Sequence, residues 1–586
     1  MRKAFGTLVS LALLFGALPL RASAAPPVQD AETRVVDYVR GASGQPPSNQ
    51  ELSARARKAA DAARTGALPA SPSAAGQSGP PGGTVPPAAG QVTNVKAYGA
   101  KGDGKANDTA AIQSAINAVG AAGGGVVFIP RGTYKVTGLT VAANYVRLLG
   151  EGWATQIAMS NATGDTITFS NGRTGFTPLE DATYLTGCGV ENLRLEPSVT
   201  RTSGSEIVAY RYNKLYLNNL CIQNVFQGML LGRVTDLAIT AYVQNLRMRQ
   251  YIAFGVKMVN VIELYGDGWA LDKFDQTNNT YSIWLSGLTS TVCLTNSDIV
   301  NSMVSTAAKE TTNNVIALYI HDDTGQSGAI LLSNYFTNCL FDSHSRGVRG
   351  DNGTNNYFTT CFFADRSVAG QPIPGVGVTI TAGTDWSFVN CYAMNNGGPG
   401  YYVGGNGAVT IMGGGVSGNN YQGFPSTNSY SAGIILDQSD GGNARVIGVS
   451  INKNTGIFPT NNQQWGIWIT ASAGDFTIES NNLQWNNTGA INNLAGIGLN
   501  KRIRNNRGYA TENSGRATIP TGSTTVNVTH NLGVTPSSQH VRITPISAGN
   551  NVFYYVTATS ATTFTVTLSG NPGAGGFQFG WSVIVQ

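Results

Sequence analysis

Most of the chain consists of short apolar runs separated by clusters of Gly, Asn, Asp, Ser and Thr. From about residue 92 to residue 513 these runs are rich in β-branched and aromatic residues. Such runs are typical of β-strands, and their irregular spacing matches a stack of unequal coils. We therefore predict an all-β fold, a right-handed parallel β-helix in which each coil buries alternate side chains and stacks on the next.

The clearest internal repeat consists of three similar decapeptides. NYFTNCLFDS begins at Asn334, NYFTTCFFAD at Asn356 and WSFVNCYAMN at Trp386. Their starts are 22 and then 30 residues apart, which predicts a longer loop in the second coil, and such loops commonly build binding grooves. Aligning the three predicts stacks of Phe336, Phe358 and Phe388, of Cys339, Cys361 and Cys391, and of Ser343, Asp365 and Asn395.

The stretch from Val95 to Gln156 differs from the coils because it contains a helical period. Asn107 or Asp108 can cap this helix at its start, and it ends at Gly120 and the glycines that follow. A helix with one apolar stripe needs a surface to cover, and the open end of a β-helix supplies one. The stripe consists of Ile112, Ala115, Ile116 and Val119.

The same stretch carries the motifs YGAKGDG, NDTAAIQSAI, GGGVVFIPRGTY and LLGEG in order. This set resembles the start of the pectate-lyase-superfamily domain, which includes polygalacturonase-like and rhamnogalacturonase-like enzymes and phage tailspikes. The resemblance implies a right-handed parallel β-helix with an N-terminal capping helix, and it transfers no catalytic residue. Asn107 is a departure, because relatives often have an acidic residue at this position.

The segments before the coils have other compositions. Residues 1–24 have a charged start, an apolar core and an Ala-Ser-Ala end, as in a secretory signal peptide; a membrane anchor is the competing interpretation. Residues 25–66 form a short helical leader, which can dock, bind a partner or remain mobile. Residues 67–91 are a linker rich in Pro, Gly and Ala. We expect a secreted protein, extracellular or periplasmic, with no membrane contact after signal cleavage.

After the β-helix domain (92–513), residues 514–586 alternate apolar and polar positions between turn clusters. This pattern predicts a small antiparallel β-sandwich, and the resemblance to tailspike-like proteins implies glycan binding or trimerisation for it. Its aromatic residues can stack on sugars or form the core, and core packing is the favoured interpretation. They are Tyr554, Tyr555, Phe577, Phe579 and Trp581.

The composition limits the classes of partner that we expect for the protein. Charged residues make up 12% of the 586, and the formal net charge of +5 includes Arg2, Lys3 and Arg21 of the expected signal peptide. No basic run is present, so we expect no nucleic-acid partner, and a weakly basic surface is compatible with an acidic polysaccharide. The six cysteines lie in strand-like runs without CxxC spacing, which favours free buried thiols over disulfides and predicts no metal site.

Three polar clusters are candidate functional sites, although each alone could be a solvated turn. The first is YGDGWALDKFD from Tyr265, the second is IHDDTG from Ile320, and the third is FDSHSRGVRGD from Phe341. The second and third are about one coil apart, so we expect them to meet on one face. The catalytic candidates are Asp322, Asp323, His321, Asp342 and His344, because paired acids and histidines suit acid–base chemistry. The substrate-binding candidates are Arg346, Arg349, Asp267, Asp272, Lys273 and Trp269, the last as a platform for a sugar ring.

The favoured hypothesis is an exported polysaccharide-degrading enzyme, a glycoside hydrolase or polysaccharide lyase acting on an acidic exopolysaccharide or cell-wall glycan. The alternatives are a non-catalytic, tailspike-like glycan-binding protein and a uronate epimerase. The GHG, NTD and RIK motifs of polygalacturonases are absent from the sequence, although Asp322 and Asp323 form a DD pair. No cofactor is required, but a lyase could use Ca²⁺. The resemblance makes a homotrimer one expected assembly and a single-chain enzyme the other.

Overall fold

The structure is a computed structural model of the chain. The expected signal peptide, leader and linker lie outside the residues that it describes, and so do Asp322, Asp323 and His344. Within the described residues no helix is both long enough and apolar enough to span a membrane. The described ranges are 92–175, 183–273, 280–287, 296–306, 315–321, 332–342, 346–365, 375–439, 441–452, 463–496, 498–547 and 552–585.

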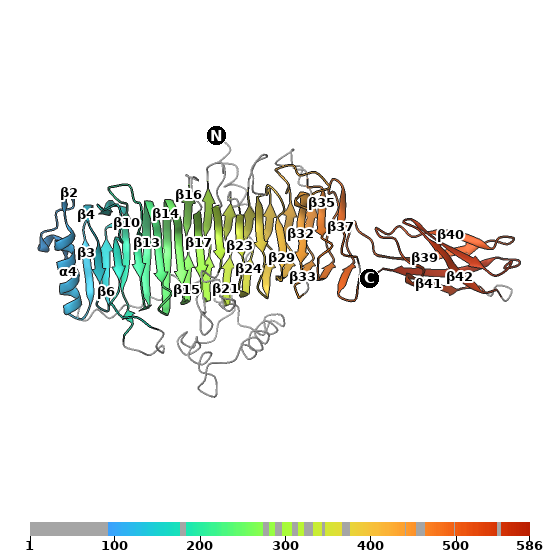
Figure 1. Ribbon diagram of the computed structural model, residues 1–586, viewed down its shortest axis with the longest axis horizontal. Helices are drawn as coiled ribbons and strands as arrows, with labels where there is room; N and C mark the ends of the chain where they lie inside the picture. Colours follow the sequence, from blue (N-terminus) through green and yellow to red (C-terminus); the bar gives the residue numbers. More distant parts are fainter. Residues whose placement is uncertain are drawn as a thin grey trace, which may run out of the picture. The chain divides into compact units, whose positions relative to one another are not determined.

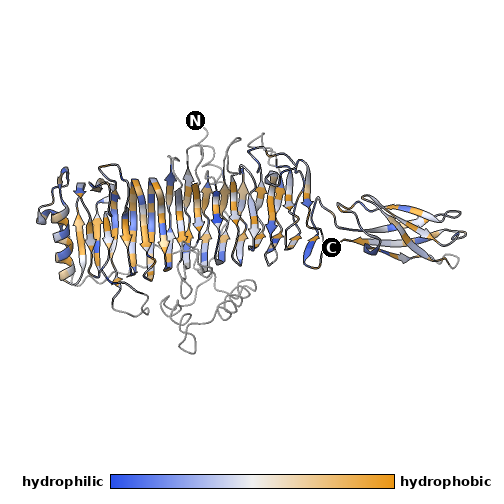
Figure 2. Cartoon of the chain, viewed as in Figure 1, coloured by the Kyte–Doolittle hydropathy of each residue, from blue (hydrophilic) through white to orange (hydrophobic). Residues whose placement is uncertain are grey.

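Three ladders of parallel strands form the β-helix, as predicted, and the coils between the two ends contribute to all three ladders (Figure 1). Three strands, β10 (Gly189–Leu195), β13 (Leu215–Gly232) and β14 (Ala238–Val259), run through more than one ladder. Figure 2 shows apolar residues in every coil, alternating with polar ones. Alternation of this kind gives each strand one buried face and one outer face.

The three ladders are called sheet 1, sheet 2 and sheet 3 below. The strands that belong to only one of these sheets are as follows. Sheet 1 contains β1 (Val92–Asn94), β3 (Gly125–Ile129), β6 (Val146–Gly150), β15 (Val261–Asp267), β18 (Asn296–Val300), β21 (Leu332–Thr337), β24 (Thr354–Thr359), β27 (Trp386–Val389), β30 (Ala408–Met412), β33 (Asn443–Ile447), β36 (Asp475–Glu479) and β38 (Lys501–Arg504). Sheet 2 contains β2 (Asp103–Asn107), β4 (Gly132–Val136), β7 (Thr155–Met159), β16 (Ala270–Lys273), β19 (Met303–Thr306), β22 (Leu340–Asp342), β25 (Phe362–Ala364), β28 (Tyr392–Met394), β31 (Gly415–Ser417) and β34 (Ser450–Asn452). Sheet 3 contains β5 (Leu139–Val141), β8 (Ile167–Phe169), β11 (Ser205–Ala209), β17 (Thr280–Ser286), β20 (Val315–Ile320), β23 (Arg346–Gly350), β26 (Val376–Ile380), β29 (Tyr401–Gly405), β32 (Ala432–Gln438), β35 (Trp465–Ile469) and β37 (Gly489–Asn493).

Helix α4 (Thr109–Ala121) packs on the first coils with the predicted apolar stripe buried (Figure 1). Asp108 occupies the N-cap position, but its carboxylate makes no hydrogen bond to the helix N-terminus. It accepts hydrogen bonds from the backbone N–H groups of Lys101 (2.6 Å) and Gly102 (3.0 Å) and so holds the glycine-rich loop. The Asn107 side chain instead accepts from the Thr109 N–H at 3.0 Å.

The interior confirms the predicted phenylalanine stack, whereas Ser343 of the third predicted stack lies outside the described residues. Phe358 lies between Phe336 and Phe388, with ring centroids 4.7 Å apart on both sides. The described cysteines are free and buried, as expected, and Cys293 lies outside the described residues. The thiols of the predicted cysteine stack donate to backbone carbonyls: Cys339 to Ile299, Cys361 to Phe336 and Cys391 to Phe358.

Two three-stranded antiparallel sheets enclose an apolar core in the C-terminal domain. Its first strand begins at Glu512, two residues before the expected boundary. Phe577, Phe579 and Trp581 are buried there, as favoured, whereas Tyr554 and Tyr555 are exposed. The sheets are β39 (Glu512–Ile519), β44 (Phe577–Ile584) and β41 (Val541–Pro545), and β40 (Thr525–Thr529), β43 (Thr563–Leu568) and β42 (Tyr554–Thr559).

Candidate functional site

His321 and Asp351 lie side by side at the ends of two neighbouring strands of sheet 3. His321 follows β20 directly and Asp351 follows β23, and Ile320 pairs with Gly350 in the ladder between them. His321 Nδ1 is 3.5 Å from Asp351 Oδ2. The parallel register therefore brings together residues 30 positions apart, as the one-coil spacing of the second and third clusters predicts.

The Asp351 carboxylate is the centre of this cluster. Arg349 donates from Nε to Oδ1 at 2.9 Å, and its Nη2 lies 2.8 Å from Oδ2. The Tyr319 hydroxyl donates to Oδ2 at 3.2 Å and the Thr381 hydroxyl to Oδ1 at 2.9 Å. Burial alone would raise the pKa of Asp351, but the hydrogen bonds from His321 and Arg349 and the charge of Arg349 hold it well below its ordinary value. The carboxylate therefore stays ionised beside the imidazole.

Aromatic rings surround this charged group. Tyr319 stacks on His321 (centroids 4.8 Å apart) and on Tyr281 (4.9 Å), and Tyr281 lies 4.6 Å from the Trp284 ring. The Lys257 ammonium lies 3.4 Å from the centre of the Trp284 ring. Burial, reinforced by the charge of Asp351, raises the pKa of Tyr319, so its phenol remains protonated at neutral pH.

Arg346 adds a second guanidinium at the start of β23. Burial, and then the neighbouring charge of Arg349, lower its pKa. Arg346 Nε is buried and has no hydrogen-bond partner among the described residues. A buried donor of this kind favours the arrival of an acceptor, and a guanidinium fits a carboxylate in particular.

Asp342 does not join the His321 cluster, which corrects the expectation that all of the second and third clusters share one face. It ends β22 in sheet 2, where its register neighbours are Ser305 and, one coil further, Asp272. His321, Arg346 and Arg349 belong to the strands of sheet 3. Asp342 and the His321 cluster therefore belong to different sheets of the β-helix.

Asp272 lies on the outer face of sheet 2 in a network of ion pairs. Its Oδ2 is 2.6 Å from Arg247 Nη2 and 3.5 Å from Arg249 Nε, and the Ser305 hydroxyl donates to Oδ1 at 3.2 Å. Asp267 accepts a hydrogen bond from the Asn301 amide at 3.1 Å. Asp267 and Asp272 of the first cluster are therefore both bound to neighbouring side chains.

The prediction of substrate binding is corrected for two other members of the first cluster, because both are buried. Trp269 is 1% exposed, and its Nε1 donates to the Val243 carbonyl at 2.8 Å, so its ring has no face for a sugar. Lys273 is 2% exposed, and its ammonium donates to the Tyr251 carbonyl at 3.0 Å. Each side chain points into the coil because strand alternation places it there.

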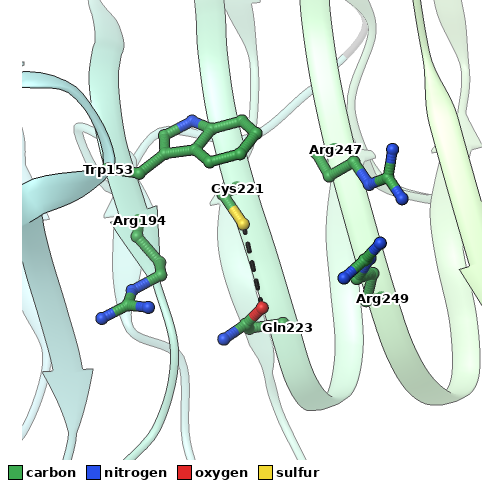
Figure 3. Close-up of a pocket in the computed structure, with 6 residues that line it drawn as sticks. All are labelled: Trp153, Arg194, Cys221, Gln223, Arg247 and Arg249. Carbon is green, nitrogen blue, oxygen red and sulfur yellow. Dashed lines mark hydrogen bonds between the residues drawn. The ribbon is translucent and has the colours of Figure 1, made fainter.

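Three arginines on the outer face of sheet 2 line a cavity of about 410 Å³, which the sequence analysis missed (Figure 3). Arg194, Cys221 and Arg247 pair in register across three coils. The available signal was the run Arg-Met-Arg within an apolar strand, which places Arg247 and Arg249 on one face. The cavity is lined by Trp153, Arg194, Cys221, Gln223, Arg247 and Arg249.

No group of three His, Cys, Asp or Glu residues in the described part of the chain is arranged to hold a metal ion. The two arrangements on the outer faces instead combine guanidinium groups with aromatic rings. Such pairs of groups suit a ligand that has both a carboxylate and a ring with C–H faces.

The family model described as rhamnogalacturonase A/epimerase, pectate lyase-like, matches residues 92–232. The chain is 51% identical to mannuronan C5-epimerase AlgE1 of Azotobacter vinelandii over 67 residues, which are 10% of this chain and 5% of that protein. It is 62% identical to alginate lyase 7 of the same organism over 45 residues, 8% of this chain and 5% of that protein. The chain therefore spans less than a tenth of the length of these curated relatives.

Among solved structures, the A-module of mannuronan C-5 epimerase AlgE6 of Azotobacter vinelandii aligns with a TM-score of 0.37 and 16% identity, over 71% of this chain and 98% of that one. The Pseudomonas phage phi297 tailspike gp61 aligns with a TM-score of 0.45 and 12% identity, over 85% of this chain and all of that one. The predicted resemblance to pectate-lyase-like β-helix proteins is thus confirmed over residues 92–232.

Proposed function

We propose that the chain acts on an acidic polysaccharide and removes the proton next to a uronate carboxylate, with His321 as the base. The observation that supports this most directly is the His321–Asp351 pair, which lies 3.5 Å apart beside Arg349 and a group of aromatic rings. Abstraction of a proton beside a carboxylate needs a base and a positive group that stabilises the charge that develops on the carboxylate.

Each member of the cluster has a role in this chemistry. The ionised Asp351 faces His321 Nδ1, which leaves the other ring nitrogen as the base. The Arg349 guanidinium, which lies beside Asp351 at the same strand end, is suited to hold the substrate carboxylate, whereas Arg346 pairs with Ile316 at the far end of the strands. The faces of Tyr281 and Trp284 offer surfaces on which a sugar ring can stack.

Two products are compatible with this step. The electron pair of the C5–H bond can form a C4–C5 double bond while the glycosidic oxygen leaves and takes a proton, which is elimination. Alternatively C5 takes a proton from the opposite face, which is epimerisation and leaves the chain length unchanged. The short segments shared with proteins named mannuronan C5-epimerase and alginate lyase support a uronate polymer as the substrate.

Hydrolysis is the second candidate, and Asp351 disfavours it at this site. A glycoside hydrolase needs one protonated carboxylic acid as well as one carboxylate. The lowered pKa keeps Asp351 ionised, so this residue is unsuited to the acid role. Hydrolysis would then depend on Asp322 and Asp323, which lie outside the described residues.

The test is to incubate the purified protein with mannuronan and other uronate polymers, and to do the same with the His321→Ala variant. We expect the native protein to produce either the ultraviolet absorbance of an unsaturated uronate or inversion at C5 detected by proton NMR. Removal of a general base should lower the rate by about 10²- to 10⁴-fold. His540→Ala, in the C-terminal domain, is the matched control and should keep the rate. New reducing ends without unsaturation would instead establish hydrolysis, and binding without product would establish a glycan-binding protein.

We also propose that the protein is exported, on the basis of residues 1–24 alone. Fractionation of cells that produce the chain with and without these residues tests this proposal, and retention of both forms in the cytoplasm would contradict it.

Light scattering during size-exclusion chromatography distinguishes a homotrimer from a single chain. Addition of a chelator during the assay tests whether the activity uses Ca²⁺.

A further inference from the structure

We propose that the arginine-lined cavity on sheet 2 is a second binding site of this chain, for a carboxylated sugar unit of an acidic polysaccharide. The proposal rests on the proposed function only for the class of ligand. The site is separate from the His321 cluster, because its residues belong to η3 (Gly152–Ala154), β10, β13 and β14 on sheet 2, whereas Tyr319 and Arg349 belong to sheet 3.

The parallel register builds the positive surface of the site. Arg194, Cys221 and Arg247 occupy the same position in three successive coils, and Gln223 and Arg249 form the next outward row. Neighbouring strands lie about 4.8 Å apart, a distance similar to the length of one sugar unit in a polymer. A polysaccharide that lies along the coils can therefore present successive sugar units to successive strands.

The carboxylates of Asp272 and Glu196 help to hold the arginine side chains in place. Asp272 contacts Arg247 at 2.6 Å and Arg249 at 3.5 Å. Arg194 donates to the Gln156 side chain at 2.6 Å and lies 3.5 Å from Glu196. A guanidinium carries five N–H donors, so the pairing with Asp272 leaves Arg247 with further donors for a ligand.

Arg194 supplies an independent sign of a missing acceptor. Its Nε is buried and has no hydrogen-bond partner among the described residues. Leaving a charged donor unpaired is costly, and a ligand carboxylate is an acceptor that would satisfy it. Arg194 is also one of the residues that line the cavity.

Trp153 gives the site a second kind of contact. It is 46% exposed, and its indole ring lies beside Cys221 over the cavity, with Arg247 on one side (Figure 3). An exposed indole offers a flat apolar face to the C–H groups of a sugar ring. The cavity volume of about 410 Å³ lies within the range of small-ligand pockets. An aromatic face next to guanidinium groups matches a sugar that bears a carboxylate.

A second site has a consequence for long substrates. A polymer bound at the cavity stays tethered to the protein, which raises the effective concentration of its other segments near the His321 cluster. Short oligosaccharides that fill only one site do not gain from this effect. The site is thus expected to affect affinity for polymers more than the chemistry itself.

The test is titration calorimetry with a short mannuronate oligosaccharide and its carboxyl-reduced, neutral counterpart. The protein carries His321→Ala so that the ligand is not consumed, and it is compared with versions that also carry Arg249→Ala, Arg249→Lys, Trp153→Ala or Arg445→Ala. Arg445 lies exposed on β33 of sheet 1 and serves as the matched control. We expect about tenfold weaker binding with Arg249→Ala and with Trp153→Ala, partial rescue with Arg249→Lys, and no change with Arg445→Ala.

The outcomes separate this proposal from the proposed function. Unchanged affinity in both Arg249→Ala and Trp153→Ala would overturn the second site, whatever the activity of the native protein. Equal binding of the neutral counterpart would overturn carboxylate recognition. If His321→Ala instead keeps full activity, the proposed catalytic role fails while the calorimetric result for the cavity still stands.

Discussion

The two faces of sheet 1 in the middle coils use the same repeat in opposite ways. On the inner face Phe336 and Phe358 stack at 4.7 Å and are fully buried. On the outer face of the same strands Tyr335 and Tyr357 stack at 5.1 Å, with Tyr335 37% exposed. The geometry is nearly the same, so burial is the main difference between the two stacks. The contribution of a stack to the free energy of unfolding therefore depends on whether the stack is buried or exposed to solvent.

Sheet 3 shows a third use of the repeat, in which unlike residues meet. Its ladder places His321 beside Asp351 and Tyr319 beside Arg349, so adjacent coils contribute different groups to one cluster. Stacking of like residues stabilises the coils, whereas juxtaposition of unlike polar residues creates a site with chemistry. Three substitutions distinguish these uses by the size of their effects.

The largest effect on stability is expected at the inner stack. Phe358→Ala removes a ring packed between Phe336 and Phe388, and such truncations in a core cost about 3–5 kcal/mol. Equilibrium unfolding in urea measures this loss. Tyr392→Ala, at an exposed position on β28, is the control and should change the free energy of unfolding by less than about 0.5 kcal/mol. Equal losses in the two variants would contradict the assigned inner and outer faces.

A smaller effect is expected at the polar cluster. Asp351→Asn keeps the shape of the side chain but removes the charge that pairs with Arg349, which should cost about 1–3 kcal/mol at neutral pH. The lowered pKa of Asp351 gives stability that is present above its ordinary value of 3.8 and is lost as the pH falls through the lower folded-state pKa. Unfolding measured at neutral and acidic pH should show the difference between native protein and variant shrinking in acid.

The control for that pH dependence is Glu512→Gln, an exposed position at the start of β39. Its effect on the free energy of unfolding should be small at both pH values. A difference between native protein and Asp351→Asn that grows in acid would show that Asp351 is not held ionised by the cluster.

The smallest effect is expected at the outer stack. Tyr335→Ala removes one partner of the Tyr335–Tyr357 pair, and an exposed aromatic pair contributes about 0.5–1.5 kcal/mol. Burial raises the pKa of Tyr357 to about 12, and the neighbouring Tyr335 adds to the increase. Spectrophotometric titration of the variant should therefore show one tyrosine titrating at a lower pH. A stability loss as large as that of Phe358→Ala would remove the distinction between the two stacks.

Part of the candidate site was predictable because the second and third clusters are about one coil apart in the sequence. His321 and Arg349 were expected to lie one coil apart, and the ladder of β20 and β23 brings their strands together. Asp342 belongs to the same sequence cluster as Arg349, but β22 and β23 belong to different sheets. Sequence distance along a coil does not reveal where the chain turns from one sheet to the next.

The second limit on prediction was whether a given side chain points into the coil or outward. Trp269 and Asp272 are close in the sequence and both are buried, yet the Trp269 indole donates to a backbone carbonyl whereas Asp272 pairs with arginines on the outer face. The arginine cavity was missed because Arg194 and Arg247 are far apart in the chain and each is isolated in its own strand. Only the register of β10, β13 and β14 aligns them.

The sequence by itself determined the β-helix, its capping helix, the inner phenylalanine and cysteine stacks and the separate C-terminal sandwich. These features depend on local alternation and on repeated apolar residues, which any stack of coils must bury. Only the tertiary structure decided which polar groups meet on the outer faces. Which polar side chains become neighbours depends on the register between coils and on where the chain passes from one sheet to the next. Outward side chains have no apolar pattern in the sequence from which the register or these positions could be predicted.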